Sequence, residues 1–144
     1  MRIDGEWYEC DDEVLRPVVR GEVLNAHGSW EPVLFLVDTG ADCTVFSAAI
    51  LDVLGFELGT ARTRLGGIGG VAESVDVTTR IRLARDDGGN AVFRGRYAAF
   101  TQLESLDMSV LGRDIMQMFA VIVDRPDDVV SLVGQQHRYV IETQ

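Results

Sequence analysis

The feature that most constrains the fold is the segment Phe35–Val45, in which an apolar run leads directly into a carboxylate. A strand ending at Leu36-Val37 would bury its side chains and place Asp38 at the mouth of a core. Thr39 can hydrogen-bond locally and hold the loop that follows. Gly40 allows a sharp turn and the close approach of another backbone. The segment therefore predicts a strand that delivers one carboxylate to a tight loop.

Two glycine-containing segments follow this loop. About seventy residues later, Val110–Asp114 repeats the apolar-apolar pattern and ends in Gly-Arg-Asp. Between them, Leu65–Val71 contains four glycines in five consecutive residues, which is typical of a mobile hairpin tip. Taken singly, each segment also fits an ordinary turn or a plain hairpin, because Asp and Gly are common turn residues.

In this order and spacing, the three segments resemble the motifs of the retropepsin-like aspartic proteases, the single-domain retroviral type. Members of that family carry apolar-apolar-Asp-Thr/Ser-Gly-Ala, a glycine-rich flap and a Gly-Arg-Asp/Asn motif. The resemblance covers most of the chain. It implies a mainly β fold, a closed, Greek-key-like β-barrel of the acid-protease type with one or two short helices. Residues 1–144 would form one domain, in which residues 1–13 are a candidate N-terminal arm.

The resemblance assigns roles to the first motif. Asp38 is the catalytic carboxylate, and Thr39 grips the loop of a second subunit. Gly40 and Ala41 are small so that the substrate backbone can pass close by. Cys43 would line a substrate side-chain pocket, although a free cysteine is more commonly a small buried hydrophobe.

The resemblance also assigns roles to the two glycine segments. Asp42 would form a structural ion pair with Arg113, pinning the active-site loop; two solvated surface charges are the alternative. The remaining members of the second glycine motif are Leu111, Gly112 and Asp114. The flap over the substrate would comprise Gly66, Gly67, Ile68, Gly69 and Gly70. The aromatic residue that the family often carries near the flap tip is missing here, so the closure contacts stay open.

Hydrolysis of a peptide bond by carboxylates needs two of them, because one takes a proton from water while the other gives a proton to the carbonyl oxygen. This chain has a single Asp-Thr-Gly. Given the family resemblance, one chain supplies only one of the two carboxylates. The site would therefore need a two-fold homodimer in which Asp38 of each subunit meets on the axis. The leading hypothesis is thus a homodimeric aspartic endopeptidase, a hydrolase acting on peptides or proteins without a cofactor.

The amino-acid composition argues against several other kinds of binding partner. The chain has 144 residues and a net charge of −10, which suits one domain and disfavours binding to nucleic acid or to an anionic membrane. Two cysteines do not make a disulfide framework, and His27 and His137 look like ordinary surface residues. No Cys/His spacing suggests a metal site, and no signal or membrane-spanning run is visible, so a cytoplasmic location is expected.

Hydrophobic periodicity and turn residues predict the remaining elements. Strands are expected at 14–24, 30–37, 71–83, 91–100, 120–124, 129–133 and 139–142, and short helices at 47–54 and 113–118. Ser47 is a good helix N-cap and Gly55 a good helix stop. Pro17 predicts an edge or a bulge in the first of these strands.

Two other functions fit parts of the sequence. One is a catalytically weak or inactive retropepsin-like module for dimerisation or peptide binding, because fold does not fix function. The other is a small β-barrel binding protein in which Asp38 is only a turn residue. The intact Asp38-Thr39-Gly40 triplet favours the enzyme.

Overall fold

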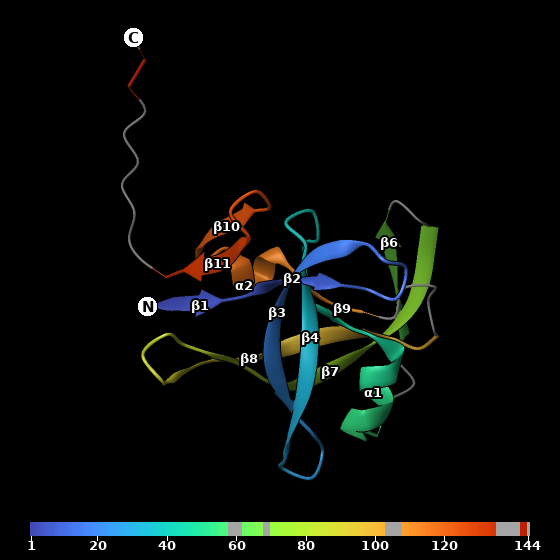
Figure 1. The fold of residues 1–144 in the computed structure, drawn as a ribbon. Helices are drawn as coiled ribbons and strands as arrows, with labels where there is room; N and C mark the ends of the chain where they lie inside the picture. The colour runs from blue at the N-terminus through green and yellow to red at the C-terminus, as the bar shows by residue number, and fades with distance from the viewer. Residues whose placement is uncertain (58–61, 68–69, 103–107, 135–141, 144) are drawn as a thin grey trace.

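The protein is described here by a computed structural model that covers residues 1–57, 62–67, 70–102, 108–134 and 142–143, with the backbone alone for 62–67 and 70–72 (Figure 1). It is mainly β with two short helices, as the sequence predicts. The elements are β1 Arg2–Asp4, β2 Glu6–Glu9, β3 Leu15–Leu24, β4 Trp30–Val37, β5 Val45–Phe46, α1 Ala48–Leu54, β6 Arg62–Gly67, β7 Gly70–Ala84, β8 Asn90–Phe100, β9 Ser109–Leu111, α2 Arg113–Met116, β10 Ala120–Asp124 and β11 Val129–Val133.

Eight of these strands form a curled sheet in the order β2-β3-β4-β9-β5-β8-β7-β6. A further pairing of β3 with β7 joins six of them into a ring. That pairing is close at Gly21, since a Cβ there would lie 2.6 Å from Leu83 Cδ2 and 3.2 Å from the Arg82 carbonyl oxygen, so these neighbours would have to shift to accept a larger residue. The ring is not strictly the closed barrel expected from the sequence, because β2 and β6 extend beyond it and β3 meets β7 at only three residue pairs.

The core lies inside this ring. Along β4, Val33, Phe35 and Val37 are buried and alternate with less buried neighbours, as the two-residue period of a strand dictates. The Phe35 ring lies 6.3 Å from the ring of Phe46, which in turn lies 5.6 Å from that of Tyr97. Packing on one face of β4 thus fixes the end of the strand that leads into the Asp38 loop.

The α1 helix has the ends that its sequence predicts. The Ser47 hydroxyl accepts a hydrogen bond from the Ile50 backbone N–H at 3.3 Å. Gly55 ends the helix with φ 67°, a left-handed conformation that favours glycine. No helix among the described residues is both long and apolar enough to cross a membrane.

A separate three-stranded sheet, β1-β11-β10, packs beside α2. The predicted hairpin of β10 and β11 has the bounds expected from the sequence, whereas α2 ends at Met116, two residues before its predicted end. The acidic N-terminal stretch contributes β1 to this sheet and β2 to the large one. The last strand predicted from the sequence, 139–142, falls almost wholly outside the described residues.

Candidate active site

The carboxylate of Asp38 stands directly after the last residue of β4. Parallel pairing sets Val37 opposite Leu111 of β9, and the Asp38 backbone N–H donates to the Leu111 carbonyl at 3.3 Å. The chain then turns tightly, because Asp38 Oδ1 accepts from the Gly40 N–H at 3.0 Å and the Asp38 carbonyl accepts from the Ala41 N–H at 3.1 Å. The sheet and the turn together fix a half-buried carboxylate.

The next two residues, Thr39 and Gly40, are exposed. A Cβ on Gly40 would meet only Asp38 Oδ1, at 3.3 Å, among the described residues. Gly40 therefore makes no close backbone approach to any described residue, and the described part of the chain leaves this surface of the loop open.

The close approach occurs instead at Gly112. A Cβ there would lie 2.3 Å from the carbonyl carbon of Cys43 and 2.7 Å from the backbone nitrogen of Thr44. Real Cβ atoms do not come so near to backbone, so only glycine fits between the two motifs.

Arg113 ties the loop to α2 through three contacts. Its backbone N–H donates to the Ala41 carbonyl at 2.9 Å, and its Nη1 donates to the Thr39 carbonyl at 3.1 Å. Its Nη2 forms an ion pair with the Asp42 carboxylate, so the structure brings together the two charges that the sequence suggested. The ion pair is largely solvent-exposed and contributes little by itself. The two hydrogen bonds to backbone carbonyls therefore do most to hold the loop against α2.

Asp114 and Thr44 form a second tie. Asp114 Oδ1 accepts hydrogen bonds from the Thr44 backbone N–H at 3.0 Å and from the Thr44 hydroxyl at 2.7 Å. The same hydroxyl accepts from the Gly112 N–H at 3.0 Å. Sequence reasoning did not single out Thr44, and no local signal could have found it, because its partner is seventy residues away.

Cys43 is half-buried in the middle of this junction. Burial raises the pKa of its thiol, and the nearby carboxylates of Asp114, Asp42 and Asp76 raise it further. The thiol is therefore protonated at neutral pH, which suits a packing residue and not a nucleophile.

The predicted flap residues lie only partly within the described residues. β6 and β7 form an antiparallel pair that ends with Gly67 opposite Gly70, and Gly66 lies opposite Val71. Ile68 and Gly69 fall outside the described residues. The backbone pairing is that of a hairpin.

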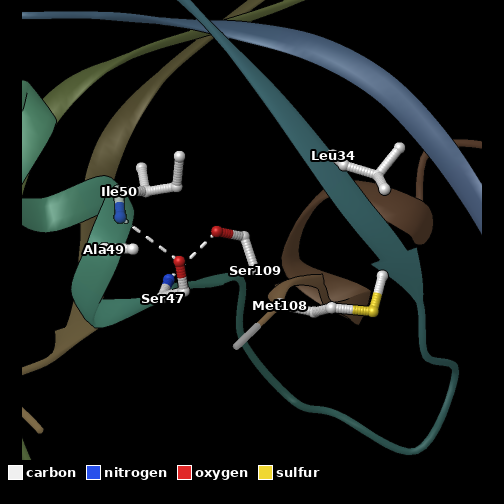
Figure 2. A pocket seen from close by; sticks show the side chains of 6 residues that line it. All are labelled: Leu34, Ser47, Ala49, Ile50, Met108 and Ser109. Atoms are coloured by element: carbon white, nitrogen blue, oxygen red, sulfur yellow. Dashed lines mark hydrogen bonds between the residues drawn. The ribbon is translucent and has the colours of Figure 1, made fainter. Parts of the chain in front are cut away.

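A small cavity of about 150 Å³ lies between α1, β4 and β9, and Asp38 is not among its lining residues (Figure 2). Its lining residues are Leu34, Ser47, Ala49, Ile50, Met108 and Ser109. The Ser109 hydroxyl accepts from the Ser47 backbone N–H at 3.0 Å and so connects α1 to β9.

Among the described residues, no cluster of His, Cys, Asp or Glu could hold a metal ion.

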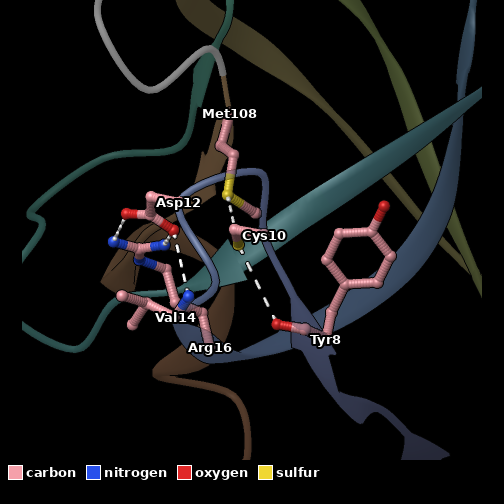
Figure 3. A network of polar contacts seen from close by, with 6 residues as sticks. All are labelled: Tyr8, Cys10, Asp12, Val14, Arg16 and Met108. Atoms are coloured by element: carbon pink, nitrogen blue, oxygen red, sulfur yellow. Dashed lines mark hydrogen bonds and ion pairs between the residues drawn. The ribbon is translucent and has the colours of Figure 1, made fainter.

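The second cysteine, Cys10, is buried in the turn after β2, next to Met108 (Figure 3). Its sulfur lies 3.7 Å from that of Met108. Beside it, Arg16 forms an ion pair with Asp12 at 2.7 Å and holds the pKa of that carboxyl at about 2. These contacts fix the turn between β2 and β3.

Comparison with known proteins gives a consistent assignment. Residues 21–115 match the family model described as aspartyl protease. The EIAV protease in complex with the inhibitor HBY-793 is 25% identical, with a TM-score of 0.50, covering 71% of this chain and 86% of that one. A retropepsin-like aspartic protease from Rickettsia conorii is 21% identical, with a TM-score of 0.56, covering 92% of this chain and 88% of that one.

A search of curated proteins found no match. The family match spans well over half of the chain, including the Asp38 loop and the second glycine motif. The retropepsin-like structures share its fold. The chain therefore belongs to the aspartyl protease family.

Proposed function

We propose that this protein is a homodimeric aspartic endopeptidase in which the Asp38 carboxylates of two subunits form the catalytic dyad. The observation that carries the proposal is the placement of Asp38. A half-buried carboxylate ends a core strand and is held by a backbone hydrogen bond to β9. Three ties from α2 then hold the loop that follows it.

The need for a second subunit follows from the chemistry. A lone carboxylate cannot both accept a proton from water and donate one to the carbonyl oxygen. The chain has one Asp-Thr-Gly, so the second carboxylate comes from a symmetry-related copy. Thr39 and Gly40 are exposed, which leaves this surface of the loop accessible to the equivalent loop of a partner.

In the proposed mechanism the two Asp38 carboxyl groups share one proton, because two adjacent like charges cannot both ionise easily. The ionised group activates a water molecule, and the protonated group donates to the scissile carbonyl oxygen. The substrate is an extended peptide, and the segment Gly66–Gly70 closes over it as a flap. Cys43 lines a substrate side-chain pocket as a neutral thiol.

Subunit mixing with Asp38→Asn tests the shared dyad. This variant keeps the shape of the side chain, and we expect it to be a folded dimer without measurable turnover on a peptide library at pH 4–7. If subunits exchange at random, an equal mixture should keep about half of the wild-type activity, because a quarter of twice as many dimers are fully wild type. A nine-fold excess of the variant should leave about a tenth. Asp52→Asn, the same change on an exposed helix position, is the matched control and should leave activity unchanged.

Exchange must be shown independently, for example by energy transfer between labelled subunits. Full activity after demonstrated exchange would refute the shared dyad, since each chain would then hold a complete site. A wild-type protein that dimerises but cleaves no peptide would instead favour the binding module.

A further inference from the structure

Most of the arginine side chains that the structure describes in this acidic chain are neutralised by ion pairs. The sequence has 23 acidic residues against 13 basic ones, and every basic residue is arginine. Among the ten arginines whose side chains the structure describes, eight form ion pairs with Asp or Glu. The other two, Arg80 and Arg94, have neither an ion pair nor a side-chain hydrogen bond within the described part of the chain.

These two arginines are neighbours. Arg80 of β7 lies directly opposite Arg94 of β8 in the antiparallel register, so both side chains stand on the same face of the hairpin. Both are exposed, while Thr79 and Ile81 on the other face of β7 are buried. Like charges directly opposite each other destabilise a sheet, so this pair works against the stability of the fold.

The surroundings confine the excess positive charge to this pair. On one side Arg82 forms an ion pair with Glu22 at 2.5 Å, and its guanidinium lies 4.3 Å from the centre of the Trp30 ring. On the other side Arg96 forms an ion pair with Asp76. The unpaired positive charge on this face is therefore limited to two adjacent guanidinium groups, with an ion pair on either side of them.

We propose that the Arg80–Arg94 face is a docking site for an acidic segment of a polypeptide. Two adjacent guanidinium groups present planar sets of donors that match carboxylates, and each can bind one bidentately. Charge complementarity also selects the location, because a chain of net charge −10 repels acidic peptides over the rest of its surface. Two cations are too few for nucleic acid, whose binding requires many phosphates to be neutralised.

The docking site lies far along β7 from the proposed flap. Arg80 stands ten residues beyond Gly70, where β7 begins, which is roughly 33 Å along an extended strand. An acidic segment bound there would hold a polypeptide on the hairpin independently of any cleavage. The inference does not depend on the peptidase activity, since binding is measured directly.

Fluorescence anisotropy with a labelled twelve-residue peptide of alternating Glu and Ser tests the proposal at low salt. The Arg80→Gln/Arg94→Gln variant should bind about fivefold to tenfold more weakly than the wild type, because it loses two charge-assisted contacts. The control Arg2→Gln/Arg125→Gln removes the same two charges from exposed, ion-paired positions. It should change the affinity less than twofold. Raising the salt concentration should weaken wild-type binding.

Equal weakening in both double variants would overturn the proposal, because it would show a response to net charge alone. The proposal would also be overturned if the wild type did not bind the peptide at millimolar concentration. It would likewise be overturned if the wild type bound an oligothymidylate of equal charge more tightly than it bound the peptide. The Asp38→Asn protein should bind the peptide as the wild type does. Failure of the peptidase assay would leave that result intact, so the two proposals can fail separately.

Discussion

The loop junction, residues 38–44 against 109–114, and the Arg80–Arg94 face use arginine in opposite ways. At the junction, Arg113 contacts two backbone carbonyls and one carboxylate of the same loop. On the face, two arginines stand opposite each other without a partner among the described residues. The comparison shows two uses of a guanidinium group. At the junction it holds a loop in position, whereas on the Arg80–Arg94 face the two groups stay accessible and lower the stability of the fold.

The largest effect is expected at the junction backbone. Gly112→Ala would push a Cβ against the carbonyl of Cys43, so we expect a loss of about 3 kcal/mol of unfolding free energy or failure to fold. Gly89→Ala in the β7–β8 turn is the control, since its nearest atom is the movable carboxylate of Asp87 at 3.2 Å. Urea denaturation at matched protein concentration measures both. Equal losses would show that the junction is no more tightly packed than the hairpin turn.

A smaller effect is expected at Asp114. Asp114→Ala leaves the Thr44 N–H and hydroxyl without their acceptor, which should lower the unfolding free energy by about 2 kcal/mol. Asp114→Asn keeps an acceptor oxygen at this position and should lose less than about 1 kcal/mol. Similar losses in the two variants would mean that the negative charge matters and that the hydrogen-bond acceptor does not.

Arg113→Ala should come next, with a loss of about 1 kcal/mol, because it removes one hydrogen bond and one exposed ion pair. Arg2→Ala, which removes a similarly exposed pair with Asp4, should lose less than about 0.5 kcal/mol. The melting temperature and the dissociation constant of the proposed dimer are the readouts. If the two variants behave alike, Arg113 is not a structural tie.

The smallest effect has the opposite sign. Arg94→Glu turns the like-charge pair into an opposite-charge pair with Arg80 and should stabilise the protein by about 0.5 kcal/mol, less at high salt. Arg96→Glu, on the same strand, should instead destabilise it by placing a carboxylate near Asp76. Calorimetry at low and high salt separates the two. A destabilised Arg94→Glu protein would show that Arg80 and Arg94 do not repel each other.

Local signals made much of the fold predictable. The alternation along β4 and the caps of α1 depend on residues that are neighbours in sequence, so the bounds of both elements could be inferred. The contact of Thr44 with Asp114 and the register that sets Arg80 against Arg94 could not, because both depend on how distant strands align. The short strands β1 and β2 were also invisible, since their stability comes from pairing with β11 and β3.

The pairing of β1 with β11 has a kinetic consequence. Arg2 lies opposite Val133, so β1 finds its partner only after the residues up to 133 have been synthesised. Contacts between such distant residues slow folding, because a long loop must close before they form. Until then β1 and the edge of β11 expose unpaired backbone groups, which can pair with other chains. The small sheet should therefore form later during translation than the pairing of β3 with β4.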